Sequence, residues 1–156
     1  MSLVIETIYG AVWDSVNALE GTSVYGVTIS SVPRRLAKGQ VSPEHGQIVV
    51  EFGDATKVET YPGSPAAEEW QQTFLIRIFT RDESETDDWS LVATRYAMAV
   101  KKNVAGTNDW HTFGDFAVDA EFTDLTHSPP NGGFAVSTWT LLVRYRISEL
   151  DPEVQR

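Results

Sequence analysis

Two stretches of the chain place apolar residues three and four positions apart, which is the spacing of one buried helix face. The first covers residues 3–19, with Ser2 as a candidate N-cap and Gly21 as a candidate C-terminal stop. We therefore predict a helix there. Its apolar stripe consists of Ile5, Ile8, Tyr9, Val12, Trp13, Val16 and Leu19.

The second stretch starts at Trp89 and runs to Lys101 and Lys102. Acidic residues precede it and lysines end it, and both arrangements complement the helix macrodipole. Ser84 or Thr86 is the expected N-cap. The pattern predicts a second helix.

Five segments favour strands because they are rich in β-branched and aromatic residues or alternate apolar with polar positions. The stretch between residues 54 and 69 is polar and contains Pro62, Gly63 and Pro65, so a long loop is expected there. Residues 33–47 are expected to form another loop, and residues 128–133 a tight reversal. The predicted strands are residues 23–32, 47–53, 71–81, 116–123 and 134–147.

The last strand has two different faces. One face carries Trp139, Leu141 and Val143, and the other carries Arg144 and Arg146. The arginines are expected to lie opposite Asp119 or Glu121 of the preceding strand.

The order of these elements predicts an α+β fold, a two-layer sandwich in which two helices pack on one face of a mainly antiparallel sheet. A length of 156 residues with 42% hydrophobic positions suits a single domain, which we place at residues 1–147. Residues 148–156 are expected to be a C-terminal extension that orders only against a partner.

The charge balance narrows the function classes. Asp and Glu number 22 against 12 Lys and Arg, a formal charge of -10, which disfavours a nucleic-acid binder. There is no cysteine, so disulfides and a cysteine nucleophile are excluded. The sequence contains no run of about 18 apolar residues, so neither a secretion signal nor a membrane span is expected.

Candidate chemistry is sparse. His45, His111 and His127 fall in three different predicted loops without metal-ligand spacing, so each is interpreted as a surface histidine. Residues 82–88 read D-E-S-E-T-D-D and lack the Gly and final Glu of a calcium loop. No hydrolase, zinc-protease or dinucleotide motif is present. The sequence predicts no enzyme, no cofactor and no metal site.

Two carboxylates and two tryptophans remain as candidates. Asp119 and Glu121 share one strand face about 7 Å apart, a separation compatible with glycoside chemistry, but solvated surface is the preferred interpretation. Trp13, Trp89 and Trp139 fall on predicted core stripes. Trp70 and Trp110 flank predicted loops and are candidates for an interface.

One predicted strand ends F-L-I-R-I-F-T-R, and the closing hairpin ends L-L-V-R-Y-R-I-S-E-L-D-P. Together with the order of the elements, these stretches resemble the tail terminator (tail completion) proteins of long-tailed bacteriophages. The resemblance covers residues 3–152. It implies a homo-hexameric ring that caps the tail tube, stops tube polymerisation and offers a surface to the head-side connector. It also implies that DNA passes the lumen without specific binding, and that the protein is located in the virion after assembly in the host cytoplasm.

The loops at residues 34–45 and 56–70 are the candidate contacts with tube protein or neighbouring subunit. The acidic run either faces the lumen or is a solvated helix start. A head-to-tail connector or stopper of the neck is the alternative function, and a small-molecule-binding α+β domain is a further one. The candidate interface residues are Arg34, Arg35, Lys38, His45, Tyr61, Trp70 and Trp110, and the candidate lumen residues are Asp82, Glu83, Glu85, Asp87 and Asp88.

Overall fold

The computed structural model describes residues 3–33, 43–81, 88–107, 110–131 and 133–155. Within these ranges the chain forms two helices and six strands, which confirms the predicted α+β class. In chain order they are α1 (Val4–Asn17), β1 (Ser23–Val24), β2 (Val27–Thr28), β3 (Gln47–Tyr61), β4 (Ala67–Arg81), α2 (Trp89–Ala105), β5 (Asp119–Asn131) and β6 (Phe134–Ser148).

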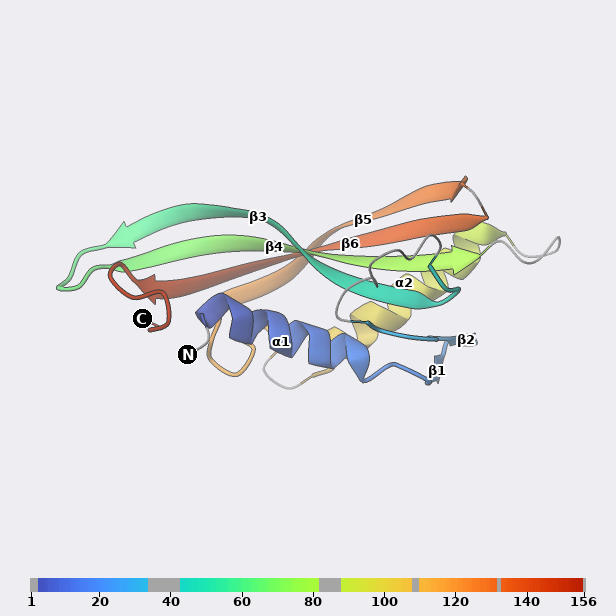
Figure 1. Cartoon of the computed structure of the whole chain (residues 1–156), viewed down its shortest axis with the longest axis horizontal. Helices are drawn as coiled ribbons and strands as arrows, with labels where there is room; N and C mark the ends of the chain where they lie inside the picture. The colour runs from blue at the N-terminus through green and yellow to red at the C-terminus, as the bar shows by residue number, and fades with distance from the viewer. Residues whose placement is uncertain (1–2, 34–42, 82–87, 108–109, 132, 156) are drawn as a thin grey trace.

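The main sheet is long, antiparallel and strongly twisted. Its strand order is β3-β4-β6-β5, and β3, β4 and β6 have 15 residues each. Figure 1 shows α1 and α2 on the same side of this sheet, so the molecule has a helical layer and a sheet layer. The short β1-β2 pair forms a separate two-stranded sheet.

The core lies between the two layers. Alternate residues of the central strands, such as Phe74, Ile76 and Leu141, are fully buried against the helices. Burial of each such side chain contributes about 1.5–3 kcal/mol. The indole N–H of Trp139 in β6 donates to the carbonyl of Ala97 in α2 at 2.8 Å, which fixes the helix on the sheet.

The helix starts differ from the predicted ones. Leu3 precedes α1, and its amide donates to the Glu6 carboxylate at 2.9 Å, whereas Ser2 lies outside the described residues. Asp88 is the N-cap of α2 and accepts from the amide of Ser90 at 2.9 Å. The prediction of Ser84 or Thr86 as the N-cap was therefore wrong, because Asp88 lies directly before Trp89 and its carboxylate satisfies an amide of the first turn.

The prediction of a long loop between residues 54 and 69 was also wrong. β3 continues to Tyr61 and β4 begins at Ala67, so only residues 62–66 turn the chain. Residues 54–60 are exposed, which removes the apolar alternation that identifies a strand in sequence. Backbone pairing with β4 nevertheless continues, with irregularities between Phe52 and Ala55 and between Lys57 and Glu59.

β5 starts later and ends later than predicted. Its first residue is Asp119, and Phe116 and Val118 are more than a third exposed instead of facing the core. The strand continues through Pro129 and Pro130 to residue 131. Proline is tolerated there because β5 is an edge strand and the pairing with β6 is irregular at these positions.

The expected C-terminal extension folds back on the domain. The amide of Ser148 donates to the Val154 carbonyl at 2.9 Å, and the amide of Glu149 donates to Ala66 in the β3-β4 turn at 2.9 Å. The amide of Val4 donates to the Pro152 carbonyl at 3.3 Å. Residues 148–155 thus order against their own chain, whereas a partner was expected to order them.

The single strand predicted at residues 23–32 is instead the β1-β2 hairpin. Its two turn residues, Tyr25 and Gly26, have φ values of 52° and 75°. Positive φ at both central positions is the geometry of a two-residue turn that suits the twist of the flanking strands.

Candidate assembly surfaces

One face of the main sheet has no helix over it in the described part of the chain. Side chains on this outer face alternate with the core residues of β4 and β6. Five of them are large, apolar and half-buried: Leu75, Phe79, Phe134, Val136 and Leu142. A broad sheet face of this kind, with apolar and paired charged side chains, is suited to contact with another protein.

A buried carboxylate organises one end of the outer face. The Glu69 side chain in β4 is only 4% exposed, and its Oε2 accepts from Arg146 Nε at 3.0 Å. Its other oxygen lies 3.5 Å from Arg144 Nη1. The Tyr61 hydroxyl of β3 donates to the same carboxylate at 3.2 Å. Three strands are therefore joined around one charge.

Two groups of this cluster, Arg146 and Tyr61, have raised pKa values. The hydrogen bond with Glu69 raises the pKa of Arg146 above its ordinary value. Desolvation raises the pKa of Tyr61, and its hydrogen bond with Glu59 adds to the rise. The Arg146 guanidinium also lies over the Tyr61 ring at 4.5 Å. A permanently charged arginine and a neutral phenol are suited to holding a surface rigid.

The network extends to the edge strand β5. Asp119 lies opposite Arg144, as predicted, with Oδ2 3.5 Å from Nη2. Its Oδ1 lies 3.6 Å from His111 Nδ1, so this histidine takes part in a side-chain contact. The prediction was wrong for the other pair, because Glu121 lies opposite Leu142 and Arg146 binds Glu69 in β4. Asp119 therefore belongs to the charge network, whereas Glu121 lies on exposed surface.

The predicted interface aromatics divide between the two faces. Trp70 lies within β4 on the helix side, packs against the core and donates its indole N–H to Glu68 at 2.9 Å. Trp110 also packs against the core and stacks on Phe122 at 5.9 Å between ring centroids. Tyr61 alone of these three lies on the outer face, because it pairs with Ala67 in the register that places Glu69 there.

The other predicted site residues have structural partners or lie outside the described ranges. His45 accepts from the Arg81 amide at 2.8 Å and lies 3.2 Å from the Tyr96 hydroxyl, so it connects the end of β4 to α2. His127 Nδ1 lies 2.8 Å from Ser137 Oγ. Asp88 caps α2, and its hydrogen bonds from Ser90 lower the pKa of its carboxyl. The candidates outside the described residues are Arg34, Arg35, Lys38, Asp82, Glu83, Glu85 and Asp87.

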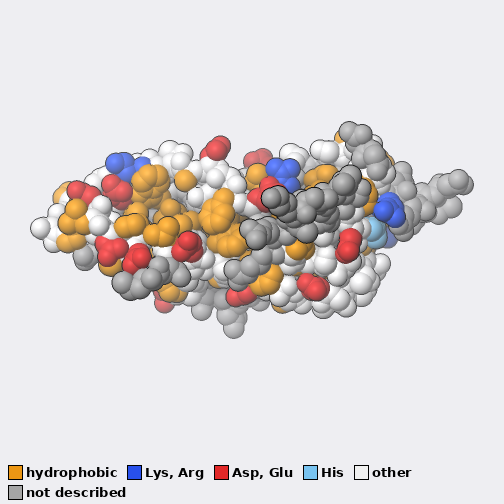
Figure 2. All heavy atoms as spheres, in the orientation of Figure 1, with side chains coloured by type: hydrophobic (Ala, Val, Ile, Leu, Met, Phe, Trp, Pro, Cys, Tyr) orange, Lys and Arg blue, Asp and Glu red, His pale blue; other side chains and the backbone are white. Residues whose placement is uncertain are grey.

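An apolar surface lies where β3 crosses α1. Phe52 is 49% exposed and stacks on Tyr9 with ring centroids 4.8 Å apart. Val58, further along β3, is exposed to the same extent. In Figure 2 hydrophobic side chains gather on the left half of the molecule, with acidic side chains around them.

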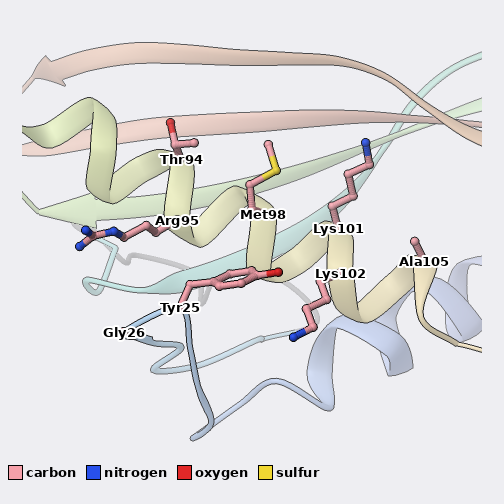
Figure 3. A pocket seen from close by; sticks show the side chains of 8 residues that line it. All are labelled: Tyr25, Gly26, Thr94, Arg95, Met98, Lys101, Lys102 and Ala105. Carbon is pink, nitrogen blue, oxygen red and sulfur yellow. The ribbon is translucent and has the colours of Figure 1, made fainter.

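A groove of about 880 Å³ runs along α2, and the sequence analysis missed it. Figure 3 shows the Tyr25 ring lying along the helix, with Arg95 on one side and Lys102 on the other. Arg95, Met98 and Lys102 recur at spacings of three and four, which was the available signal for a shared helix face. The lining residues are Tyr25, Gly26, Thr94, Arg95, Met98, Lys101, Lys102 and Ala105.

The described residues contain no cluster of three or more His, Asp or Glu side chains placed to hold a metal ion. Neither α1 nor α2, the helices of the described ranges, has the length and apolar content needed to span a membrane. No model of a known protein family matches the chain, and no curated protein matches it either.

Proposed function

We propose that this protein is a structural virion subunit that forms a homo-hexameric ring on the head-proximal end of a phage tail tube. The ring terminates tube polymerisation and provides the attachment surface for the head-side connector. Its partners are copies of itself, the tail tube protein and the connector. The proposal combines the resemblance in the sequence with the surfaces described above.

The observation that carries the proposal is the outer sheet face. Half-buried Leu75, Phe79 and Leu142 lie beside a charge network centred on Glu69, on strands of 15 residues. A subunit in a cyclic ring needs two different contact faces, because its interfaces are heterologous. The outer face and the α2 side supply two surfaces of different chemistry.

The charge of the chain agrees with a DNA passage. A formal charge of -10 gives the subunit a repulsive field toward phosphates, so DNA that crosses the lumen is not retained. Specific DNA binding would instead require a basic stripe.

Two other functions remain as competitors. A connector or stopper of the neck has the same chemistry and differs in its neighbour. A small-molecule-binding domain is favoured by one observation, the groove along α2, because apolar lining with a few polar groups is typical of ligand sites.

The test uses the purified protein alone, with tail tubes and with connectors, examined by light scattering and negative-stain imaging. We expect rings of about six subunits or caps on tube ends, as a closed cyclic assembly requires. Leu142→Lys on the outer face should abolish capping while the circular dichroism spectrum is retained. Val118→Lys, an exposed position outside this face, is the matched control. A protein that never joins tubes would refute the proposal, and attachment to connectors alone would support the neck alternative.

A further inference from the structure

The groove along α2 has a charge opposite to that of the chain. Arg95, Lys101 and Lys102 line it, and none of its eight described lining residues is acidic. The whole chain has a formal charge of -10. Three cations around the exposed Met98, which is 38% exposed, make a surface suited to an acidic and apolar partner segment.

The turn that forms one wall of the groove is held in an unfavourable backbone conformation. Tyr25 has φ 52°, a left-handed conformation that glycine or asparagine adopts more easily than a bulky aromatic residue. Its ring is 52% exposed and receives the Lys102 ammonium at 5.1 Å from its centroid. The hairpin turn requires the positive φ but not an aromatic side chain, so the exposed Tyr25 ring is free to contribute apolar surface to the groove.

The C-terminal segment, residues 148–155, has the complementary chemistry. It contains Glu149, Asp151 and Glu153 and no Lys or Arg. Leu150 is 77% exposed and Val154 is 41% exposed, although this segment is fixed to the domain by backbone hydrogen bonds. We call residues 148–155 the C-terminal knob. Because backbone hydrogen bonds already hold this segment, its exposed Leu150 and neighbouring carboxylates lose little conformational entropy on docking.

The knob cannot fill the groove of its own chain. Figure 1 shows the C-terminal segment and the β1-β2 hairpin at opposite ends of the long axis. We propose that the C-terminal segment of one copy docks into the α2 groove of a second copy, with Leu150 against Met98 and Tyr25 and the carboxylates against Arg95 and Lys102. The contact is head-to-tail and heterologous, so repetition closes a ring or builds a filament.

This contact deepens the proposed function and rests on it only for closure into a ring. A contact of one knob is small, and interfaces of this class are weak. Its charge pairs are exposed, so added salt weakens it. Closure of a ring makes the last contact intramolecular and stabilises the assembly far beyond one pair.

The absence of cysteine from the sequence allows a direct test by cross-linking. A Met98→Cys chain is mixed with a Leu150→Cys chain, and a short bifunctional thiol reagent is added at protein concentrations of roughly 10 μM to 1 mM, which span weak contacts. We expect cross-linked dimers in the mixture and far fewer with either chain alone. High salt should reduce the yield. Val118→Cys, at a position 39% exposed, replaces either partner as the matched control.

Two results would overturn the contact. One is a mixture that cross-links no better than the Val118→Cys control. The other is equal cross-linking of Met98→Cys with itself, which indicates a two-fold symmetric contact. Leu150→Glu separates this inference from the proposed function. Tube caps that persist with Leu150→Glu leave the function standing and refute the contact, whereas specific cross-links without rings or caps support the contact and refute the function.

Discussion

Burial, rather than distance, should decide how strongly the ion pairs of the sheet stabilise the protein. Glu69 and Arg146 are 3.0 Å apart with a side chain exposure of 4% for the carboxylate and 37% for the arginine. Glu51 and Arg77 are closer, at 2.8 Å, but both side chains are 40% exposed. The two pairs therefore separate the effects of distance and solvent in one fold.

The expected magnitudes differ. A hydrogen bond to a charged group contributes about 1.5–3 kcal/mol, and partial exposure of Arg146 reduces this, so we expect a coupling energy of about 1–2 kcal/mol for Glu69 and Arg146. Exposed pairs give about 0.2–1 kcal/mol, so Glu51 and Arg77 should couple less despite their shorter distance. High salt should weaken the exposed pair more.

The assay is a double-mutant cycle for each pair, measured by urea unfolding at neutral pH. Glu69→Gln, Arg146→Met and their combination form one cycle, and Glu51→Gln, Arg77→Met and their combination form the matched control. A coupling energy for the exposed pair equal to or above that of the buried pair would refute the reasoning from burial.

Three further changes test single features of the fold. Gly46→Ala places a Cβ 2.7 Å from the Thr28 carbonyl at φ +77°, so unfolding should require less urea, with a loss above about 1 kcal/mol; unchanged stability would contradict this. Trp139→Phe removes the N–H that donates to Ala97, and a thermal melt should show a loss of about 0.5–1.5 kcal/mol beyond repacking. Asp88→Ala should destabilise α2 at neutral pH. The carboxyl pKa is lowered in the folded state, so the stability that Asp88 contributes is complete above the ordinary aspartate pKa and is lost as the pH falls through the lowered value. Asp88→Asn still caps the helix and should lack this pH dependence of stability.

The helical layer and the inner face of the sheet could be predicted because burial leaves a periodic pattern. Ile8 and Val12 in α1, and Phe74 and Ile76 in β4, occupy positions that period 3.6 and period 2 place on one face. Their environment follows from local spacing alone. The fold class could therefore be predicted from the sequence.

The distal half of the β3-β4 hairpin could not, because β3 is held there by backbone pairing with β4 while its side chains at residues 54–60 lie in solvent. Residues such as Lys57 and Thr60 have the composition of a loop, and only pairing with β4 orders them. The network around Glu69 depends on Arg144 and Arg146, which are 75 and more residues away in sequence. The α2 groove likewise needs Tyr25 from a distant hairpin.

The two edges of the sheet determine how copies of this chain can associate. An open edge strand invites pairing with another chain through its free backbone groups. β3 is interrupted by irregularities around residues 53–54 and at Val58, and β5 by one at Thr123 and by Pro129 and Pro130. Such features bend an edge and remove donors, so they oppose continuous sheet extension between subunits. The proposed assembly would then use side-chain surfaces, of which the described residues offer the outer sheet face, the α2 groove and the C-terminal knob.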